Sequence, residues 1–155
     1  MALMHSVLMG LVAGMRAMTP LAAVTQAARR GHLPADNGAP RVLGNPVVSA
    51  GMLALAGGEL AGDKMRSAPD RIVLPGMVAR IASGAIAGAA LAPRRQRTLA
   101  AVLGAGAAVG AAYLTFDLRM RALRRYGQTS TGAVEDALTV GAATLIAKRA
   151  AAPRR

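Results

Sequence analysis

The hydrophobic and polar residues of this chain alternate in long blocks rather than at a short period. The longest uncharged block is TLAAVLGAGAAVGAAYLTF, which runs over 19 residues from Thr98 to Phe116. As an α-helix that rises about 1.5 Å per residue, this block would be roughly 30 Å long, the thickness of the hydrocarbon core of a bilayer. A soluble domain of this size rarely needs a helix that is apolar on every face. The pattern therefore predicts an integral membrane protein.

Further apolar blocks lie before and after this one, separated by short polar segments. They predict an all-α, polytopic bundle of about five membrane spans that forms one domain over residues 1–155. The spans are expected at residues 3–28, 46–62, 72–91, 98–118 and 132–147. Apart from the fourth, these blocks contain charged residues or much alanine, so each needs neighbouring helices to be stable in a membrane.

The first expected span contains a signal for a helix break. Thr19 can act as an N-cap with Pro20 at the first helical position, and a proline in a helix interior removes one backbone hydrogen bond. The sequence is compatible with two half-helices and with one continuous, kinked helix. Asn45 and Pro46 repeat the cap-and-proline signal at the start of the second span.

Pairs of glycines four residues apart occur in four of the expected spans. This spacing lets the backbones of two helices approach closely in lipid, so the pairs favour tight helix packing and a homo-oligomer. The expected packing positions are Gly10, Gly14, Gly58, Gly62, Gly84, Gly88, Gly106 and Gly110.

Composition and charge narrow the classes of function. The chain has no Cys, which excludes disulfides and thiolate metal sites, and the two His residues have no partner spacing, so we expect no metal and no cofactor. The net charge is +12, but the bases cluster between apolar blocks, where loops would meet anionic lipid head groups. Aromatic residues that could stack on bases make up only 2% of the chain. The expected partner is therefore the lipid bilayer and not nucleic acid.

Several ionisable residues lie within or near the ends of the expected spans. An ionisable group at membrane depth is costly and usually faces the bundle interior or a water-filled cavity. The residues are Arg16, Glu59, Asp63, Arg80, Asp117, Glu135 and Asp136. Arg16 could pair with Glu59 or Glu135, and Arg80 with Asp63 or Asp117; the sequence does not choose between these pairs.

The deepest of these charges suggest a polar site. If the chain breaks at Thr19-Pro20, the second half-helix directs its free amides and positive dipole end towards Arg16, which describes an anion site. The anion could be a substrate or the chain's own Glu59 or Glu135. The candidate residues for binding a substrate or ion are Arg16, Thr19, Glu59, Asp63, Arg80 and Glu135. The alternative is that these charges form salt bridges that hold weak spans together.

Four motifs resemble a known family in their order along the chain. They are GMRAMTP at Gly14–Pro20, GGELAGDKM at Gly57–Met65, RIASGAIAGAAL at Arg80–Leu91 and VEDALTVG at Val134–Gly141. They are similar to a bacterial family of small multi-span membrane proteins that is known as a domain of unknown function. The family commonly has Ser where this chain has Ala17, so that hydroxyl is not essential here. The resemblance implies a multi-span domain in the bacterial cytoplasmic (inner) membrane, and no reaction or substrate.

We expect a protein that moves a small solute, an ion or a lipid across the membrane. A non-transporting scaffold or partner subunit is the alternative, and a membrane enzyme acting on a lipid is a third reading, since the chain has no nucleophile motif, P-loop or dinucleotide fingerprint. A cavity that reaches the deep charges would favour transport. A sealed and paired network would favour the scaffold, and a lateral opening with unpaired acids would favour the enzyme.

Overall fold

The computed structural model describes residues 2–62, 74–126 and 128–151. The regular secondary structure of these residues is helical, with no strand, which confirms the predicted all-α class. The helices are α1 (Ala2–Met15), α2 (Met18–Arg29), η1 (Arg41–Gly44), α3 (Pro46–Gly62), α4 (Leu74–Leu91), η2 (Arg94–Gln96), α5 (Arg97–Tyr126) and α6 (Gln128–Ala151).

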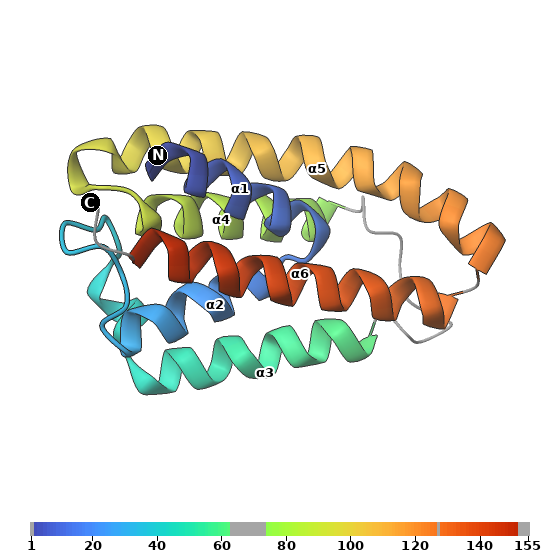
Figure 1. Cartoon of the computed structure of the whole chain (residues 1–155), viewed down its shortest axis with the longest axis horizontal. Helices are drawn as coiled ribbons and strands as arrows, with labels where there is room; N and C mark the ends of the chain where they lie inside the picture. The colour runs from blue at the N-terminus through green and yellow to red at the C-terminus, as the bar shows by residue number, and fades with distance from the viewer. Residues whose placement is uncertain (1, 63–73, 127, 152–155) are drawn as a thin grey trace.

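The first expected span, residues 3–28, forms a hairpin of two helices instead of a single crossing. α1 runs alongside α5, and α2 then returns, so that the start of α1 and the end of α2 lie at the same end of the bundle (Figure 1). With 14 and 12 residues, the two helices are about 21 Å and 18 Å long, too short to cross a hydrocarbon core of about 30 Å. The start of α1 and the end of α6 lie at the same end of the bundle (Figure 1).

The break lies earlier than the cap signal predicts. α2 begins at Met18 and its N-cap is Ala17, so the prediction that Thr19 caps the helix is wrong. Pro20 is the third helical residue, a first-turn position where the missing N–H would have no intrahelical acceptor anyway. The other end of α2 follows a local rule. Gly31 has a φ of 68°, and His32 N donates to the Ala27 carbonyl at 2.8 Å, which closes a Schellman motif.

The second expected span matches α3 at both ends. Asn45 Oδ1 accepts a hydrogen bond from Val47 N at 2.8 Å, and Pro46 is the first helical residue, so the predicted cap is confirmed. The helices that contain the last two expected spans, α5 and α6, extend beyond the expected bounds. α5 continues to Tyr126, and two bases of this extension are paired: Arg121 contacts Asp117 one turn earlier at 2.6 Å, and Arg119 contacts Glu135 of α6 at 2.8 Å.

Small residues bring α1 and α4 very close to α5. A Cβ on Gly84 would lie 2.6 Å from the carbonyl oxygen of Gly104, and one on Gly88 would lie 2.6 Å from that of Ala100. Gly104, which the spacing argument did not select, is the centre of this contact. The predicted packing glycines that lie against α5 are Gly10, Gly14, Gly84 and Gly88.

The other predicted packing glycines do not take part in a close helix contact within the described chain. A Cβ added at any of them would meet no atom within 4 Å; these residues are Gly58, Gly62, Gly106 and Gly110. They lie on outward faces of α3 and α5. A four-residue spacing therefore identified the kind of contact but not the face that makes it.

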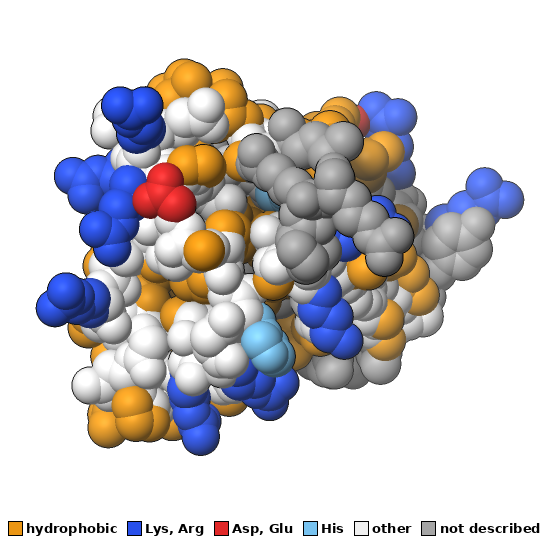
Figure 2. Space-filling model, turned by 60° about the vertical axis from the view of Figure 1, so that its left-hand side comes forward, with side chains coloured by type: hydrophobic (Ala, Val, Ile, Leu, Met, Phe, Trp, Pro, Cys, Tyr) orange, Lys and Arg blue, Asp and Glu red, His pale blue; other side chains and the backbone are white. Residues whose placement is uncertain are grey.

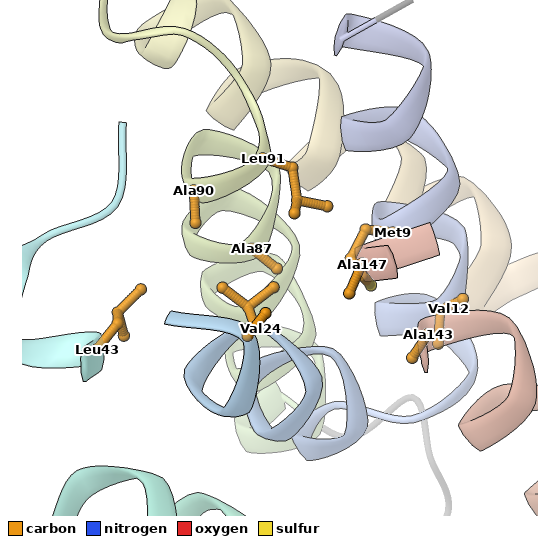
Figure 3. Close-up of a cluster of buried hydrophobic side chains, with 10 residues drawn as sticks. Met9, Val12, Val24, Leu43, Ala87, Ala90, Leu91, Ala143 and Ala147 are labelled. Carbon is orange, nitrogen blue, oxygen red and sulfur yellow. The ribbon is translucent and has the colours of Figure 1, made fainter. Parts of the chain in front are cut away.

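The apolar core lies between α1, α2, α4 and α6. Met9 and Val24 are fully buried there, and Leu91 is 1% exposed (Figure 3). Alanines of α4 and α6, including Ala87 and Ala143, fill the remaining space and keep the helices close. α3 is peripheral and packs mainly on α2 and η1.

Two helical segments are long and apolar enough to cross a membrane, judged by length and composition. They are residues 74–91, with a mean hydropathy of 1.4, and residues 94–122, with a mean hydropathy of 1.8. α1 and α3 are apolar but shorter.

Candidate functional site

Two features of the bundle could carry a function: the charged residues at the tip of the α1–α2 hairpin, and a groove beside α2. At the tip, Arg16 lies between the two helices and its side chain is 1% exposed. Its guanidinium contacts the carboxylate of Asp136 from α6. The sequence predicts Glu59 or Glu135 as the partner of Arg16, so the contact with Asp136 differs from that prediction.

Glu59 of α3 caps the start of α2. Its Oε1 accepts a hydrogen bond from Ala17 N at 2.8 Å, and its Oε2 accepts one from Met18 N at 2.9 Å. The first amides of a helix have no intrahelical acceptor, and the alanine at the N-cap has no side chain that could supply one. A carboxylate is also favoured by the positive end of the helix dipole. The anion at this helix end is therefore the chain's own Glu59.

Arg80 of α4 plays the matching role at the end of α1. Its side chain is buried, and its Nε donates a hydrogen bond to the carbonyl of Gly14 at 3.0 Å. Carbonyls in the last turn of a helix lack an intrahelical donor, and a cation there is favoured by the dipole. Both helix ends that meet at the hairpin tip are thus held by opposite charges from other helices.

The remaining acids lie further towards the ends of α5 and α6. Glu135 is 9% exposed and pairs with Arg119 of α5, a partner that the sequence analysis does not name. Because α5 and α6 are antiparallel and one residue separates them in the sequence, residues 16 apart can meet, and this spacing is the signal that could have found the pair. Asp117 forms an exposed pair with Arg121, and Asp63 lies outside the described residues.

A groove of about 430 Å³ lies between α2, α3 and α6. α2 contributes Ala22, Ala23 and Ala27 to its floor, and apolar residues of the other two helices form most of its sides. The residues on the two sides are Leu53, Ala56, Gly57 and Leu60 of α3, and Val140, Ala143, Thr144, Ala147 and Lys148 of α6. None of the charged residues at the hairpin tip is among the described residues that line it.

The groove has a different polarity at each end. At its inner end lies Thr19, whose side chain is buried and whose Oγ1 has no hydrogen-bond partner among the described residues. At its outer end, the mouth of the groove, lie three exposed side chains, those of Arg30, His32 and Lys148.

The mouth of the groove belongs to a basic end of the bundle. This end is formed by the end of α2, the loop that follows it, the turn between α4 and α5 and the end of α6, and Figure 2 shows Lys and Arg side chains distributed around it. Its exposed bases are Arg29, Arg30, Arg41, Arg94, Arg95, Arg97, Lys148 and Arg149. Asp36 is the acid that the described part of this end carries.

The chain belongs to the family described as Domain of unknown function (DUF4126), which matches residues 3–153. This confirms, at the level of the family, the resemblance inferred from the four motifs. No curated protein and no solved structure matches the chain. The family description supplies no reaction or ligand, so the function has to be argued from the geometry.

Proposed function

We propose that this chain is a polytopic membrane protein that moves a lipid along the groove between α2, α3 and α6. The observation that carries the proposal is the groove itself, which runs from a basic mouth to the buried tip of the hairpin and is lined mainly by apolar side chains. In this arrangement α3, α4, α5 and α6 cross the membrane, and α1 and α2 form a re-entrant hairpin.

The outer faces of the helices support placement in a membrane. Large apolar side chains are widely exposed: Val102 and Leu114 of α5 are 63% and 65% exposed, and Leu138 of α6 is 60% exposed. Exposed large apolar side chains on α5 and α6 are expected where these faces meet lipid instead of water. The hairpin tip is also compatible with a place in the membrane. Helix ends at membrane depth are tolerated where other protein groups form hydrogen bonds with their free amides and carbonyls. Here Glu59 and Arg80 do so.

The groove favours a lipid over an ion as the transported species. An ion path would be expected to reach the deep charges, but Arg16 contacts Asp136, Glu59 holds two amides, and the groove is lined mainly by alanine and other apolar residues. The paired charge network also favours the second candidate, a non-transporting scaffold. The two candidate functions differ in whether a lipid moves along the groove.

The first prediction tests placement in the membrane. We expect the expressed chain to stay in the membrane fraction after washes with salt and alkali, and to be extracted only by detergent. The physical reason is the exposed apolar surface of α5 and α6. Recovery of a stable, monodisperse protein in plain buffer would contradict the proposal.

The second prediction tests use of the groove with Gly57→Phe. A Cβ on Gly57 would meet no atom within 4 Å, and Gly57 lines the groove, so the new ring should fill the groove without displacing backbone. In vesicles containing a fluorescent phospholipid, the wild-type chain should speed exchange of label between the leaflets. The variant should slow that exchange by an order of magnitude or more.

The neighbouring Gly58→Phe is the matched control. Gly58 also has open space at its Cβ position but does not line the groove, so its exchange rate should equal that of the wild type. Equal slowing in both variants would point to a general effect on α3. If the wild-type chain does not speed exchange at all, the scaffold becomes the better reading.

A further inference from the structure

We propose that the mouth of the groove binds the phosphate head group of an anionic phospholipid, whose acyl chain lies along α2 towards Thr19. This inference rests on the proposed function in one respect, namely that the occupant of the groove is a lipid. It adds the class of lipid and the residues that select it: Arg30, His32 and Lys148.

The three side chains offer complementary donors to a phosphate. Arg30 supplies a planar guanidinium that can donate two parallel hydrogen bonds, Lys148 supplies a point charge, and His32 supplies an N–H group. They come from three segments, the end of α2, the following loop and the last turn of α6, yet all line the same groove. Convergence of donors from separate segments is typical of a binding site.

Bases at helix C-termini have a simpler role, which is to offset the helix dipole. α2 and α6 both end at this face, and each contributes about half a negative charge. Against about one negative charge in total stand four bases in or next to the last turns of the two helices: Arg29, Arg30, Lys148 and Arg149. The dipoles therefore leave a clear positive excess, which an anionic head group would neutralise.

The length of the groove fits one leaflet of a bilayer. From Thr19 to Arg30, α2 rises through 11 residues, or about 16 Å, close to half of a hydrocarbon core of about 30 Å. A head group at Arg30 would therefore lie at the interface while the tail reaches the midplane. The volume of about 430 Å³ lies in the lower part of the range for ligand sites, so the groove takes one chain and leaves the other in the bilayer.

The inner end of the groove is closed by one polar side chain, that of Thr19. Thr19 is 5% exposed, and its Oγ1 has no partner among the described residues. A buried hydroxyl without a partner costs about 1–3 kcal/mol. An acyl chain has no hydrogen-bonding atoms, so this hydroxyl does not select the tail and only marks the inner end of the groove.

The experiment measures lipid selection by the full-length protein in phosphatidylcholine vesicles. Spin-labelled phosphatidylglycerol and spin-labelled phosphatidylcholine are compared by the fraction of label that the protein immobilises. We expect the wild-type chain to prefer phosphatidylglycerol. The double variant Arg30→Gln/Lys148→Gln should lose this preference, by roughly tenfold for each base removed, which corresponds to about 1.4 kcal/mol per base and to the loss of a hydrogen bond to a charged group.

A matched control separates a site from general charge. Arg29→Gln/Arg149→Gln removes the same charge from neighbouring positions on the same two helices, but these residues do not line the groove. The control should keep most of the preference. Equal losses in both double variants, or an unchanged preference in Arg30→Gln/Lys148→Gln, would overturn the head-group site.

Failure of this inference is distinguishable from failure of the proposed function. If the head-group variants keep their lipid preference while Gly57→Phe still blocks exchange between leaflets, the groove moves lipid without selecting it by charge. If Gly57→Phe leaves exchange unchanged while the head-group variants lose their preference, the mouth binds lipid but the groove does not move it.

Discussion

Replacing Arg16 by alanine is expected to destabilise the fold by about 3–5 kcal/mol, the cost typical of leaving one member of a buried ion pair without its partner. The Arg16 side chain is 1% exposed, and its contact Asp136 is 13% exposed, so little water is available to solvate the remaining carboxylate. The measurement is thermal unfolding of the purified protein in detergent, together with the yield of folded protein.

A second substitution tests whether the lost stability comes from leaving Asp136 as an unpaired charge. Arg16→Ala/Asp136→Asn should recover part of the lost stability, because no unpaired charge remains. Glu59→Gln should not rescue Arg16→Ala, because the carboxylate of Glu59 also holds the amides of Ala17 and Met18.

The exposed pair on α5 is the control for this cycle. Arg121 and Asp117 are 70% and 61% exposed, and an exposed ion pair contributes at most about 1 kcal/mol, so Arg121→Ala should change stability little. If Arg16→Ala instead unfolds like the wild type but no longer moves lipid, the hairpin tip is part of the transport path and not a structural lock.

Helix boundaries could be predicted where their signals are local. Asn45 and Pro46 mark the start of α3, because the cap and the amides it binds are neighbours in sequence. The start of α2 could be predicted only to within a few residues. Its amides are held by Glu59, about forty residues away, and no local pattern shows which distant side chain will cap a helix.

The return of α2 along the bundle could not be predicted either. A break in an apolar segment is equally compatible with two collinear helices and with a hairpin. The choice depends on contacts such as Gln26 with Ser49 and Glu59 with Ala17, which pair α2 with α3 in antiparallel order. These contacts form only when distant segments meet.

The candidate site, too, could be predicted from the sequence only in part. The energetic cost of placing a charged side chain at membrane depth was enough to select Arg16, Glu59 and Arg80 from the sequence. The structure brings all three to the hairpin tip. Hydropathy could not indicate the groove, because its alanines are also typical of packed helices. Nor could it show that Arg30, His32 and Lys148 would line one mouth.

Glycine spacing shows why a face cannot be chosen from a period alone. Gly104 and Gly106 are both on α5, but two residues turn a helix by about 200°, so the two positions face nearly opposite directions. Gly104 meets the carbonyl of Gly84, whereas Gly106 meets open space. The rotation of the helix decides between them, and that is a property of the assembled bundle.

Replacing Gly84 by leucine is therefore expected to have a large effect, while the same change at Gly106 is not. A Cβ on Gly84 would lie 2.6 Å from the carbonyl oxygen of Gly104, and this atom is backbone, so it cannot rotate away. The helices must separate, which typically costs about 1–3 kcal/mol and occasionally more. Gly10 contacts the same carbonyl of Gly104, so separation at one contact also disturbs the packing of α1.

Thermal unfolding in detergent of Gly84→Leu and Gly106→Leu tests this difference. Gly84→Leu should lower the melting temperature clearly, and Gly106→Leu should leave the monomer unchanged because its Cβ position has open space. If Gly106→Leu instead alters the oligomeric state measured by light scattering, the outward face of α5 packs against a second copy, as the original glycine pattern predicts. Equal melting temperatures for wild type and Gly84→Leu would contradict a backbone contact between α4 and α5, since no side-chain adjustment can remove that overlap.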